Sequence, residues 1–413
     1  MKTVIKNIQC LVTCNNYNIK DAGIIENGYV LIEDAIIKDV GSGEDYKKLL
    51  EEDSVIIDAT GKTLTPGLVD CHTHVVYGGS REKELQLKLK NVSYLEILNN
   101  GGGILSSVKE TRKLSLEELY AQSEKRLDLM LLHGTTTIES KSGYGLNFED
   151  EIKMLQVNKL LNEKHHLDVI STYMGAHAIP MEYKENRRGY LDFVINKVIP
   201  YISENNLAEF IDIFCEKGVF TIEESREILL AGKGSNLKIK IHADELESIG
   251  GAELSAELNA ISAEHLVGVS KEGIRQMVEK GVTPVLLPAT SFYLRLNRYA
   301  NAKAMIAAGL NIALATDCNP GTSPTESLQI VMTFACFGMG LLPEEIINAM
   351  TINAARAICR DNTIGSIEKG KVADLVLFNT PSLDYLVYHF GINSVDIVIK
   401  KGKIVVEGGK IIC

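Results

Sequence analysis

The sequence lacks three features that mark common protein classes: paired cysteines, a long apolar run and an excess of basic residues. Its eight cysteines include no Cys-x-x-Cys pair, which argues against a disulfide scaffold or a cysteine-rich metal module. Several of them lie in apolar stretches, where a thiol behaves as a small hydrophobe. This use of cysteine predicts a reducing cytoplasm.

No apolar run is long enough to anchor or export the chain. Residues 1–18 interrupt their apolar positions with Lys2, Lys6 and Asn7, unlike the continuous apolar segment of a secretory signal. Residues 328–342 are the most apolar stretch, but they contain Gln329 and stop at Pro343, short of the roughly 20 residues that a spanning helix needs. We expect no membrane partner, and a buried helix over residues 328–342.

Basic residues are outnumbered, with 43 Lys and Arg against 54 Asp and Glu and a net charge of −11. Such a chain repels a phosphate backbone, so we expect no nucleic-acid partner. A small anionic substrate would need a local cationic pocket. With 45% apolar and 23% charged residues over 413 positions, the composition excludes a disordered chain and allows a sizeable core.

The pattern of short strands and turns differs between the ends of the chain and its middle. Strand-like runs with tight turns occupy residues 1–65 and return in residues 366–413. Because chain ends often lie close together, we expect both segments to form one small, discontinuous β-sandwich-like domain. Residues 66–365 would then form a separate catalytic domain.

The middle of the chain alternates short apolar runs with longer amphipathic segments, the pattern of repeated βα units. Eight such runs occur, at residues 68–74, 135–142, 169–178, 210–216, 237–245, 260–266, 283–288 and 311–317. They predict an α/β fold, a (β/α)8 TIM-type barrel whose strand ends carry polar groups. An open doubly wound sheet is the alternative, but neither G-x-G-x-x-G nor a phosphate-binding Gly-Lys-Ser/Thr loop is present.

Histidines and a carboxylate at the ends of these runs suit one metal ion. His72 and His74 are spaced i, i+2, so both rings project from the same strand face, and His242 and Asp317 end other runs. Three imidazoles and one carboxylate suit Zn2+ or iron with an open position for water. His265 is either a fifth ligand or a proton-handling neighbour. Lys141 is either a carboxylated bridge between two metals or a lysine in a polar rim.

These motifs resemble the amidohydrolase superfamily of metal-dependent barrel hydrolases, and within it the imidazolonepropionase family. The matching segments are residues 66–74 (PGLVDCHTH), 79–82 (GSRE), 101–104 (GGGI), 141–145 (KSGYG), 175–178 (GAHA), 214–220 (FCEKGVF), 242–246 (HADEL) and 317–324 (DCNPGTSP). The His-x-His motif is common to the superfamily, whereas KSGYG and DCNPGTSP are particular to the narrower family.

The resemblance implies that His72, His74, His242 and Asp317 hold one Zn2+ or Fe3+ per subunit, without a carboxylated lysine. Lys141 then has a structural or substrate-rim role. The implied activity is hydrolysis of 4-imidazolone-5-propanoate to N-formimidoyl-L-glutamate in histidine degradation. Water activated by the metal attacks the ring carbonyl, His265 stabilises the developing charge, and Asp317 or Glu245 transfers the proton.

The resemblance also implies the substrate contacts and a homodimer. Arg81 would clamp the propanoate with its guanidinium fork, with Tyr94 beside it. The remaining implied substrate contacts are Tyr144, His177, Glu245, Asn319, Gly321 and Thr322.

Two other functions are compatible with the same barrel. A cyclic-amidine deaminase, or another cyclic amidohydrolase, would keep the metal ligands and differ in its need for Arg81. A metal-free assembly protein on the same barrel would bind no transition metal. All four candidate ligands are present in this chain.

Overall fold

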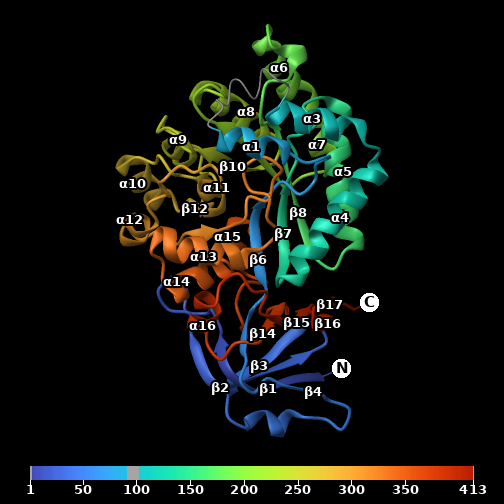
Figure 1. The fold of residues 1–413 in the computed structure, drawn as a ribbon, viewed down its shortest axis with the longest axis vertical. Coiled ribbons are helices and arrows are strands. Elements are labelled where there is room, and N and C mark those ends of the chain that lie inside the picture. Colours follow the sequence, from blue (N-terminus) through green and yellow to red (C-terminus); the bar gives the residue numbers. More distant parts are fainter. Residues whose placement is uncertain (1, 91–101, 413) are drawn as a thin grey trace.

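The computed structural model describes residues 2–90 and 102–412, whose strands form two sheets: an eight-stranded barrel and a nine-stranded terminal sheet at one end of it (Figure 1). Both chain termini lie on the side of the terminal sheet. The predicted α/β barrel with an additional sheet built from both chain ends is confirmed.

The eight predicted strands form one parallel sheet, in which each strand pairs with the next along the chain. Hydrogen bonds between the segment after the last strand and the first strand close the ring, from Asp317 N to His72 O at 3.0 Å and from His74 N to Cys318 O at 2.9 Å. The strands are β6 (Leu68–Thr73), β7 (Thr135–Lys141), β8 (Asp168–Ala176), β9 (Phe210–Cys215), β10 (Lys238–Ala243), β11 (Ser262–His265), β12 (Thr283–Leu286) and β13 (Ala313–Leu314).

Helices surround the barrel, as Figure 1 shows. Two of the longer helices begin with capping boxes, Ser115 with Glu118 and Thr221 with Glu224, in which each pair satisfies backbone N–H groups of the first turn. The helices of the barrel region are α1 (Lys83–Leu89), α3 (Ile104–Lys113), α4 (Leu116–Leu132), α5 (Phe148–Lys164), α6 (Arg187–Phe193), α7 (Ile199–Glu204), α8 (Ile222–Gly234), α9 (Gly251–Glu257), α10 (Lys271–Lys280), α11 (Pro288–Tyr293), α12 (Ala302–Ala307), α13 (Leu328–Met339), α14 (Pro343–Ala349) and α15 (Ile352–Ala357).

The period of two along a strand divides the barrel residues between two environments. Ile211, Ile241 and Ala263 belong to the large apolar cluster of the barrel. The residues that follow them, Asp212, His242 and Glu264, project from the opposite face and are buried against one another. The alternation therefore places a polar layer on the other side of the strands from the apolar cluster.

The terminal sheet joins both ends of the chain. Strand β5 pairs with β1 on one side and with β14 on the other, so the first and last parts of the chain share one hydrogen-bonded sheet. The predicted domain limits at residues 65 and 366 stay a prediction. The strands are β1 (Lys2–Val12), β2 (Ile24–Glu33), β3 (Ile36–Ser42), β4 (Val55–Asp58), β5 (Thr63–Pro66), β14 (Leu375–Phe378), β15 (Val395–Lys400), β16 (Lys403–Glu407) and β17 (Lys410–Ile411), with helix α16 (Leu383–Tyr388) after β14.

The apolar segment predicted as a buried helix is a helix with one buried face. Leu328, Val331 and Met332 of α13 are buried, but Phe337 is 68% exposed. The prediction of a buried helix holds for one face of α13 only, because apolar composition alone cannot show which side of a helix faces the core. None of the helices in the described part of the chain is both long and apolar enough to cross a bilayer.

Candidate metal centre and active site

The first two predicted ligands lie where the barrel closes. His72 is the last residue but one of β6 and His74 follows the strand, and both rings approach the carboxylate of Asp317, which follows β13. The distance to Asp317 Oδ1 is 3.4 Å from His72 Nε2 and 3.6 Å from His74 Nε2. Closure of the barrel thus brings together residues more than 240 positions apart.

The third predicted ligand, His242, lies in the same cluster with His265. The ring centroid of His242 is 4.6 Å from that of His72, 5.6 Å from that of His74 and 5.0 Å from that of His265. The possible ligand atoms of His72, His74 and Asp317 lie within 4.8 Å of one another, as do those of His72, His242 and His265. Five predicted site residues therefore meet at the carboxyl ends of four strands.

Two of these residues have a backbone conformation that L-amino acids seldom adopt. His265 has a φ of +71° and Asp317 a φ of +53°. Left-handed backbone at non-glycine residues is uncommon and is concentrated at functional sites. Here it lets the chain turn sharply at the strand end while the side chain stays in the cluster.

The donor set fits a transition metal. Ligand atoms about 2.1 Å from a tetrahedral ion lie about 3.4 Å apart, close to the separations of His72 and His74 from Asp317. The buried Nε2 of His72 has no hydrogen-bond partner among the described residues, and an uncompensated buried nitrogen is costly. A cation coordinated between these rings and Asp317 would satisfy that nitrogen.

The charges around the cluster also favour a cation. Burial alone would raise the pKa of Asp317, but its interactions with His72, His265 and the Thr290 hydroxyl lower it to about 2. The hydroxyl of Thr290 donates to Asp317 Oδ2 at 2.6 Å. Burial lowers the pKa of His265 well below its usual value, and His242 adds to this effect. Asp317 is therefore a carboxylate and His265 a neutral imidazole near pH 7.

Carboxylates contact the other nitrogens of two predicted ligands. Asp212 Oδ2 accepts from His242 Nδ1 at 3.0 Å, and Glu264 Oε2 contacts His72 Nδ1. Such contacts fix the tautomer and orientation of a metal-binding histidine.

Lys141 lies completely buried inside the barrel, not at a polar rim. Its completely buried ammonium contacts Glu139 at 2.7 Å, Asp212 at 2.9 Å and Glu264 at 3.1 Å. Burial lowers its pKa, but these three carboxylates outweigh burial and hold the pKa well above its usual value. Of the two roles that the resemblance left open for Lys141, structural or at the substrate rim, its complete burial favours the structural one, because sequence position cannot show depth within a barrel.

Glu245 is a buried carboxyl beside His265. Its Oε1 lies 3.7 Å from His265 Nδ1. Burial, together with the negative charges of Asp317 and Glu216, raises the pKa of Glu245 to about 8. A carboxyl with a pKa near neutrality can both accept and donate a proton under physiological conditions.

Tyr144 and His177 form an aromatic wall beside His74. The His177 ring stacks on His74 with centroids 5.2 Å apart, and Tyr144 lies 6.0 Å from His74 and 5.3 Å from His177. Burial lowers the pKa of His177 to about 3, so its ring is neutral. Both predicted contact residues therefore adjoin the candidate metal site.

Arg81 is held by a neighbouring glutamate. Its Nε and Nη2 donate to the two oxygens of Glu84 at 3.0 and 2.8 Å, and its Nη1 lies against Gly321. Within the part of the chain that the structure describes, no hydrogen bond to Nη1 occurs, so the edge formed by Nη1 and Nη2 can still bind a carboxylate. Tyr94, predicted beside Arg81, lies outside the described residues.

The loop after Asp317 is organised by Asn319. The Oδ1 of Asn319 accepts from Gly321 N at 2.8 Å and from Thr322 N at 2.7 Å, and its Nδ2 donates to Asp317 O at 2.7 Å. Lys88 Nζ donates to Gly321 O at 2.8 Å. Asn319 thus holds the other two predicted contact residues of this loop, Gly321 and Thr322, by hydrogen bonds.

Sequence reasoning missed the charged layer beneath the metal cluster. Its members are Glu139, Asp212, Lys240 and Glu264, all buried. A signal was present, since the pairs Glu139–Lys141 and Lys240–His242 repeat the i, i+2 spacing of His72 and His74 within apolar runs. Charged residues at that spacing inside a strand lie on the same face as the ligands.

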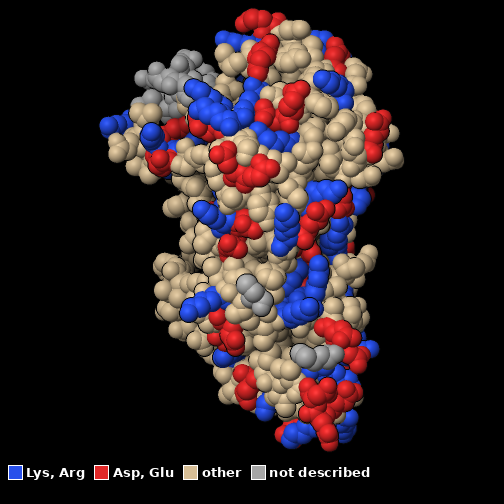
Figure 2. Space-filling view, turned by 90° about the vertical axis from the view of Figure 1, so that its right-hand side faces the viewer, with Lys and Arg blue, Asp and Glu red and all other residues tan. Residues whose placement is uncertain are grey.

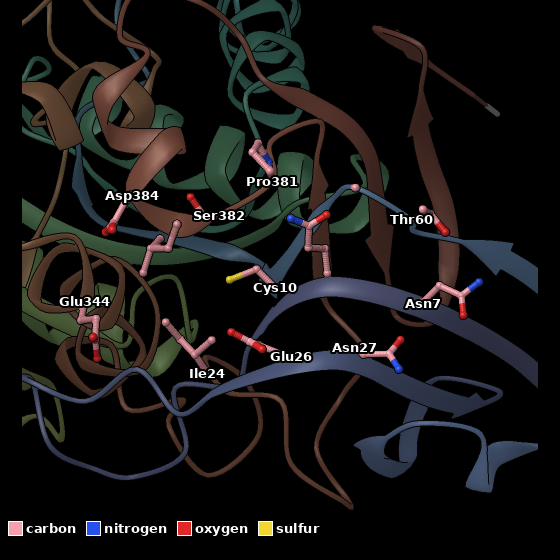
Figure 3. A pocket seen from close by; sticks show the side chains of 13 residues that line it. Asn7, Cys10, Ile24, Glu26, Asn27, Thr60, Glu344, Pro381, Ser382 and Asp384 are labelled. Carbon is pink, nitrogen blue, oxygen red and sulfur yellow. The ribbon is translucent and has the colours of Figure 1, made fainter.

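A separate cavity lies away from this cluster. It has a volume of about 840 Å3 and is lined by Cys10, Glu26 and Glu344 together with other residues of the terminal sheet and residues 381–384 at the start of α16 (Figure 3). None of the predicted site residues lines it. The chemistry of the metal cluster, rather than cavity size, identifies the candidate active site.

Comparisons with known proteins agree with this geometry. The profile of the Amidohydrolase family matches residues 63–405. The chain is 53% identical to an imidazolonepropionase of Alkaliphilus oremlandii, over 99% of both chains, and 54% identical to one of Treponema denticola, over 93% of both.

Solved structures share the fold at low identity. An adenosine deaminase from Xanthomonas campestris with bound zinc has a TM-score of 0.72 and 19% identity, with 99% of this chain and 94% of that chain covered. An atrazine chlorohydrolase from Arthrobacter aurescens complexed with zinc has a TM-score of 0.74 and 15% identity, with 99% and 96% covered. The chain is a metal-dependent hydrolase of the amidohydrolase family and belongs, within it, to the imidazolonepropionases.

Proposed function

We propose that this enzyme opens the ring of 4-imidazolone-5-propanoate by hydrolysis and releases N-formimidoyl-L-glutamate. The observation that carries the proposal is the convergence of His72, His74, His242 and Asp317 at the carboxyl ends of the barrel strands. A metal ion held by these residues would supply a Lewis acid and a water of lowered pKa.

The residues around the cluster transfer the proton and stabilise the charge that develops in the reaction. Water adds its oxygen to the ring carbonyl carbon, the C–N bond of the ring breaks, and the proton of the water passes to the departing nitrogen. Glu245, with its pKa near 8, accepts that proton and returns it, and Asp317 is the alternative carrier. His265 stabilises the negative charge that develops on the carbonyl oxygen.

The substrate is oriented by its carboxylate and its ring. The free edge of Arg81 binds the propanoate with two charge-assisted hydrogen bonds. Tyr144 and His177 pack beside the imidazolone ring, and the loop of Asn319, Gly321 and Thr322 covers it from the other side. Acidic and basic side chains are interspersed on the face of the molecule that Figure 2 shows.

Turnover of imidazolonepropanoate by the metal-loaded protein tests this function. We expect rapid loss of substrate, abolished by His242→Ala and reduced at least a hundredfold by Glu245→Gln. Arg81→Met should raise KM strongly with a smaller effect on kcat. No turnover, combined with deamination of a cyclic amidine, would assign the chain to the alternative chemistry. Purified protein without transition metal would favour the assembly protein.

The three nitrogens and one oxygen of the site support Zn2+ or Fe3+, one per subunit. Metal analysis of protein purified without added metal distinguishes the two ions. We further infer a reducing cytoplasm as the compartment, since the seven cysteines within residues 2–412 are free thiols and five of them are buried.

We infer a homodimer from the family and from exposed aromatic side chains near α13 and α16. Phe337 is 68% exposed and Phe390 61% exposed, with their rings 6.1 Å apart, and Tyr388 is also exposed. Large exposed apolar groups that gather on one surface favour association. Sedimentation at micromolar concentration should give a dimer that Phe337→Glu weakens. A monomer in the unmodified protein would remove this inference.

A further inference from the structure

Beneath the candidate metal site, two lysines and three carboxylates are completely buried. They are Lys141, Lys240, Glu139, Asp212 and Glu264. Burying charge is costly unless each group is paired. A layer of this kind next to a metal cluster therefore calls for an explanation beyond stability, because apolar residues of similar size would fill the space at lower cost.

Lys141 contacts the carboxylate oxygens that face the histidines. Asp212 Oδ2 lies 2.9 Å from Lys141 Nζ and 3.0 Å from His242 Nδ1. Glu264 Oε2 lies 3.1 Å from the same ammonium and contacts His72 Nδ1. One ammonium thus bridges the carboxylates behind two metal-binding rings.

Lys240 carries the same ammonium group as Lys141 but contacts different oxygen atoms. Its Nζ lies 3.2 Å from Glu264 Oε1, the oxygen that does not face His72, and donates to Cys71 O at 3.1 Å. It also lies 3.6 Å from Glu139. Lys240 balances charge in this layer without touching an oxygen that contacts a histidine.

We propose that Lys141 is a positioning residue of the metal site: its ammonium fixes Asp212 and Glu264 so that they hold His242 and His72 in the tautomer and orientation that bind the ion. The inference rests on the metal site of the proposed function and deepens it. Without Lys141, the two carboxylates repel each other and lose their shared hydrogen-bond donor, so both rings lose their orientation.

The test compares Lys141→Met with Lys240→Met. Both changes remove one buried ammonium from the same layer, so both should lower the thermal midpoint of the metal-free protein. Outer contacts of metal-binding histidines typically change metal affinity by about 10- to 100-fold. We expect a loss of that size for Zn2+ in Lys141→Met, measured by competition with a chelator, and a loss below about threefold in Lys240→Met.

The absorption spectrum of the Co2+-substituted protein gives a second readout, because it reports the geometry of the ligands directly. Lys141→Met should change the position or intensity of the visible bands, whereas Lys240→Met should keep the spectrum of the unmodified protein. Equal Zn2+ affinities and equal spectra for the two variants would overturn the proposal.

A pair of variants keeps the proposal testable if Lys141→Met alone does not fold. The double variant Lys141→Met with Asp212→Asn removes one charge of each sign, and it is compared with Asp212→Asn alone. We expect the double variant to bind Zn2+ more weakly than Asp212→Asn, because Glu264 also loses its contact with the ammonium. Equal Zn2+ affinities of these two variants would overturn the proposal. Wild-type turnover tests the proposed function separately, since metal affinity can be measured without it.

Discussion

Adding one methyl group at Gly321 should displace the arginine that we assign to the substrate carboxylate. A Cβ built on Gly321 would lie 2.9 Å from Arg81 Cζ and closer still to Nη1. Comfortable contacts between carbon atoms are about 3.5–4.0 Å, so the guanidinium must move by roughly 1 Å. The backbone of Gly321 does not have a positive φ, so alanine itself brings no backbone strain.

The size of the effect follows from what Arg81 is expected to bind. Charge-assisted hydrogen bonds contribute about 1.5–3 kcal/mol each, and a displacement of 1 Å can cost about 100-fold in rate. Glu84 holds the other edge of the guanidinium at 2.8 and 3.0 Å, which limits how far Arg81 can adjust. We expect Gly321→Ala to raise KM for imidazolonepropanoate by about 10- to 100-fold, with a smaller change in kcat.

Steady-state kinetics of three variants tests this reasoning. Gly234→Ala is the matched control, because a Cβ there meets nothing within 4 Å, and it should leave KM unchanged. In an Arg81→Met background, Gly321→Ala should have little further effect, since the two changes act through the same group. An unchanged KM in Gly321→Ala, or a full additional loss in the Arg81→Met background, would refute the link between Gly321, Arg81 and the substrate.

Three further predictions concern the metal site. The pKa of Glu245 is raised to about 8, so the native metal-free protein keeps a proton that the unfolded chain loses near pH 4.5. As the pH rises from 4.5 to 8, the free energy of unfolding of the metal-free protein should therefore fall by up to about 1.4 kcal/mol per pH unit. Denaturant titrations of Glu245→Gln should lack this pH dependence. Thr290→Val removes the 2.6 Å hydrogen bond to Asp317 and should weaken Zn2+ binding about tenfold or more in chelator competition; an unchanged affinity would show that this bond does not orient the carboxylate. Chelation should abolish turnover and lower the thermal midpoint, and added Zn2+ should raise the midpoint progressively with concentration, whereas a midpoint independent of metal would contradict a site formed in the native state.

The barrel was predictable because each strand carries its own signal. Seven of the eight predicted runs contain an observed strand in full, and the eighth, residues 169–178, overlaps β8, which begins one residue earlier at Asp168. Apolar runs with polar ends at regular spacing indicate βα repeats whatever the final packing. The burial of α13 was less predictable, since a mostly apolar helix does not show which of its sides meets the core.

The candidate ligands were predictable for the same reason, and the layer behind them was predictable only in part. His72, His74, His242 and Asp317 stand at strand ends, where the fold class alone implies a meeting point. Asp212 and Glu264 lack the i, i+2 partner that marks the two lysines of the layer, so nothing local shows that they lie inside the barrel. Similarly, the pairing of Arg81 with Glu84 depends on a turn whose shape the spacing does not fix.

The amino-acid sequence by itself determined the order of the strands, the residues at their ends and therefore the chemistry that can meet there, because side-chain periodicity and strand length are local properties. The tertiary structure alone decided which nitrogen faces which carboxylate, how deep Lys141 lies and which edge of Arg81 stays free. Those features depend on the stagger of neighbouring strands and on the closure of the ring between His72 and Asp317, which only the packed chain establishes.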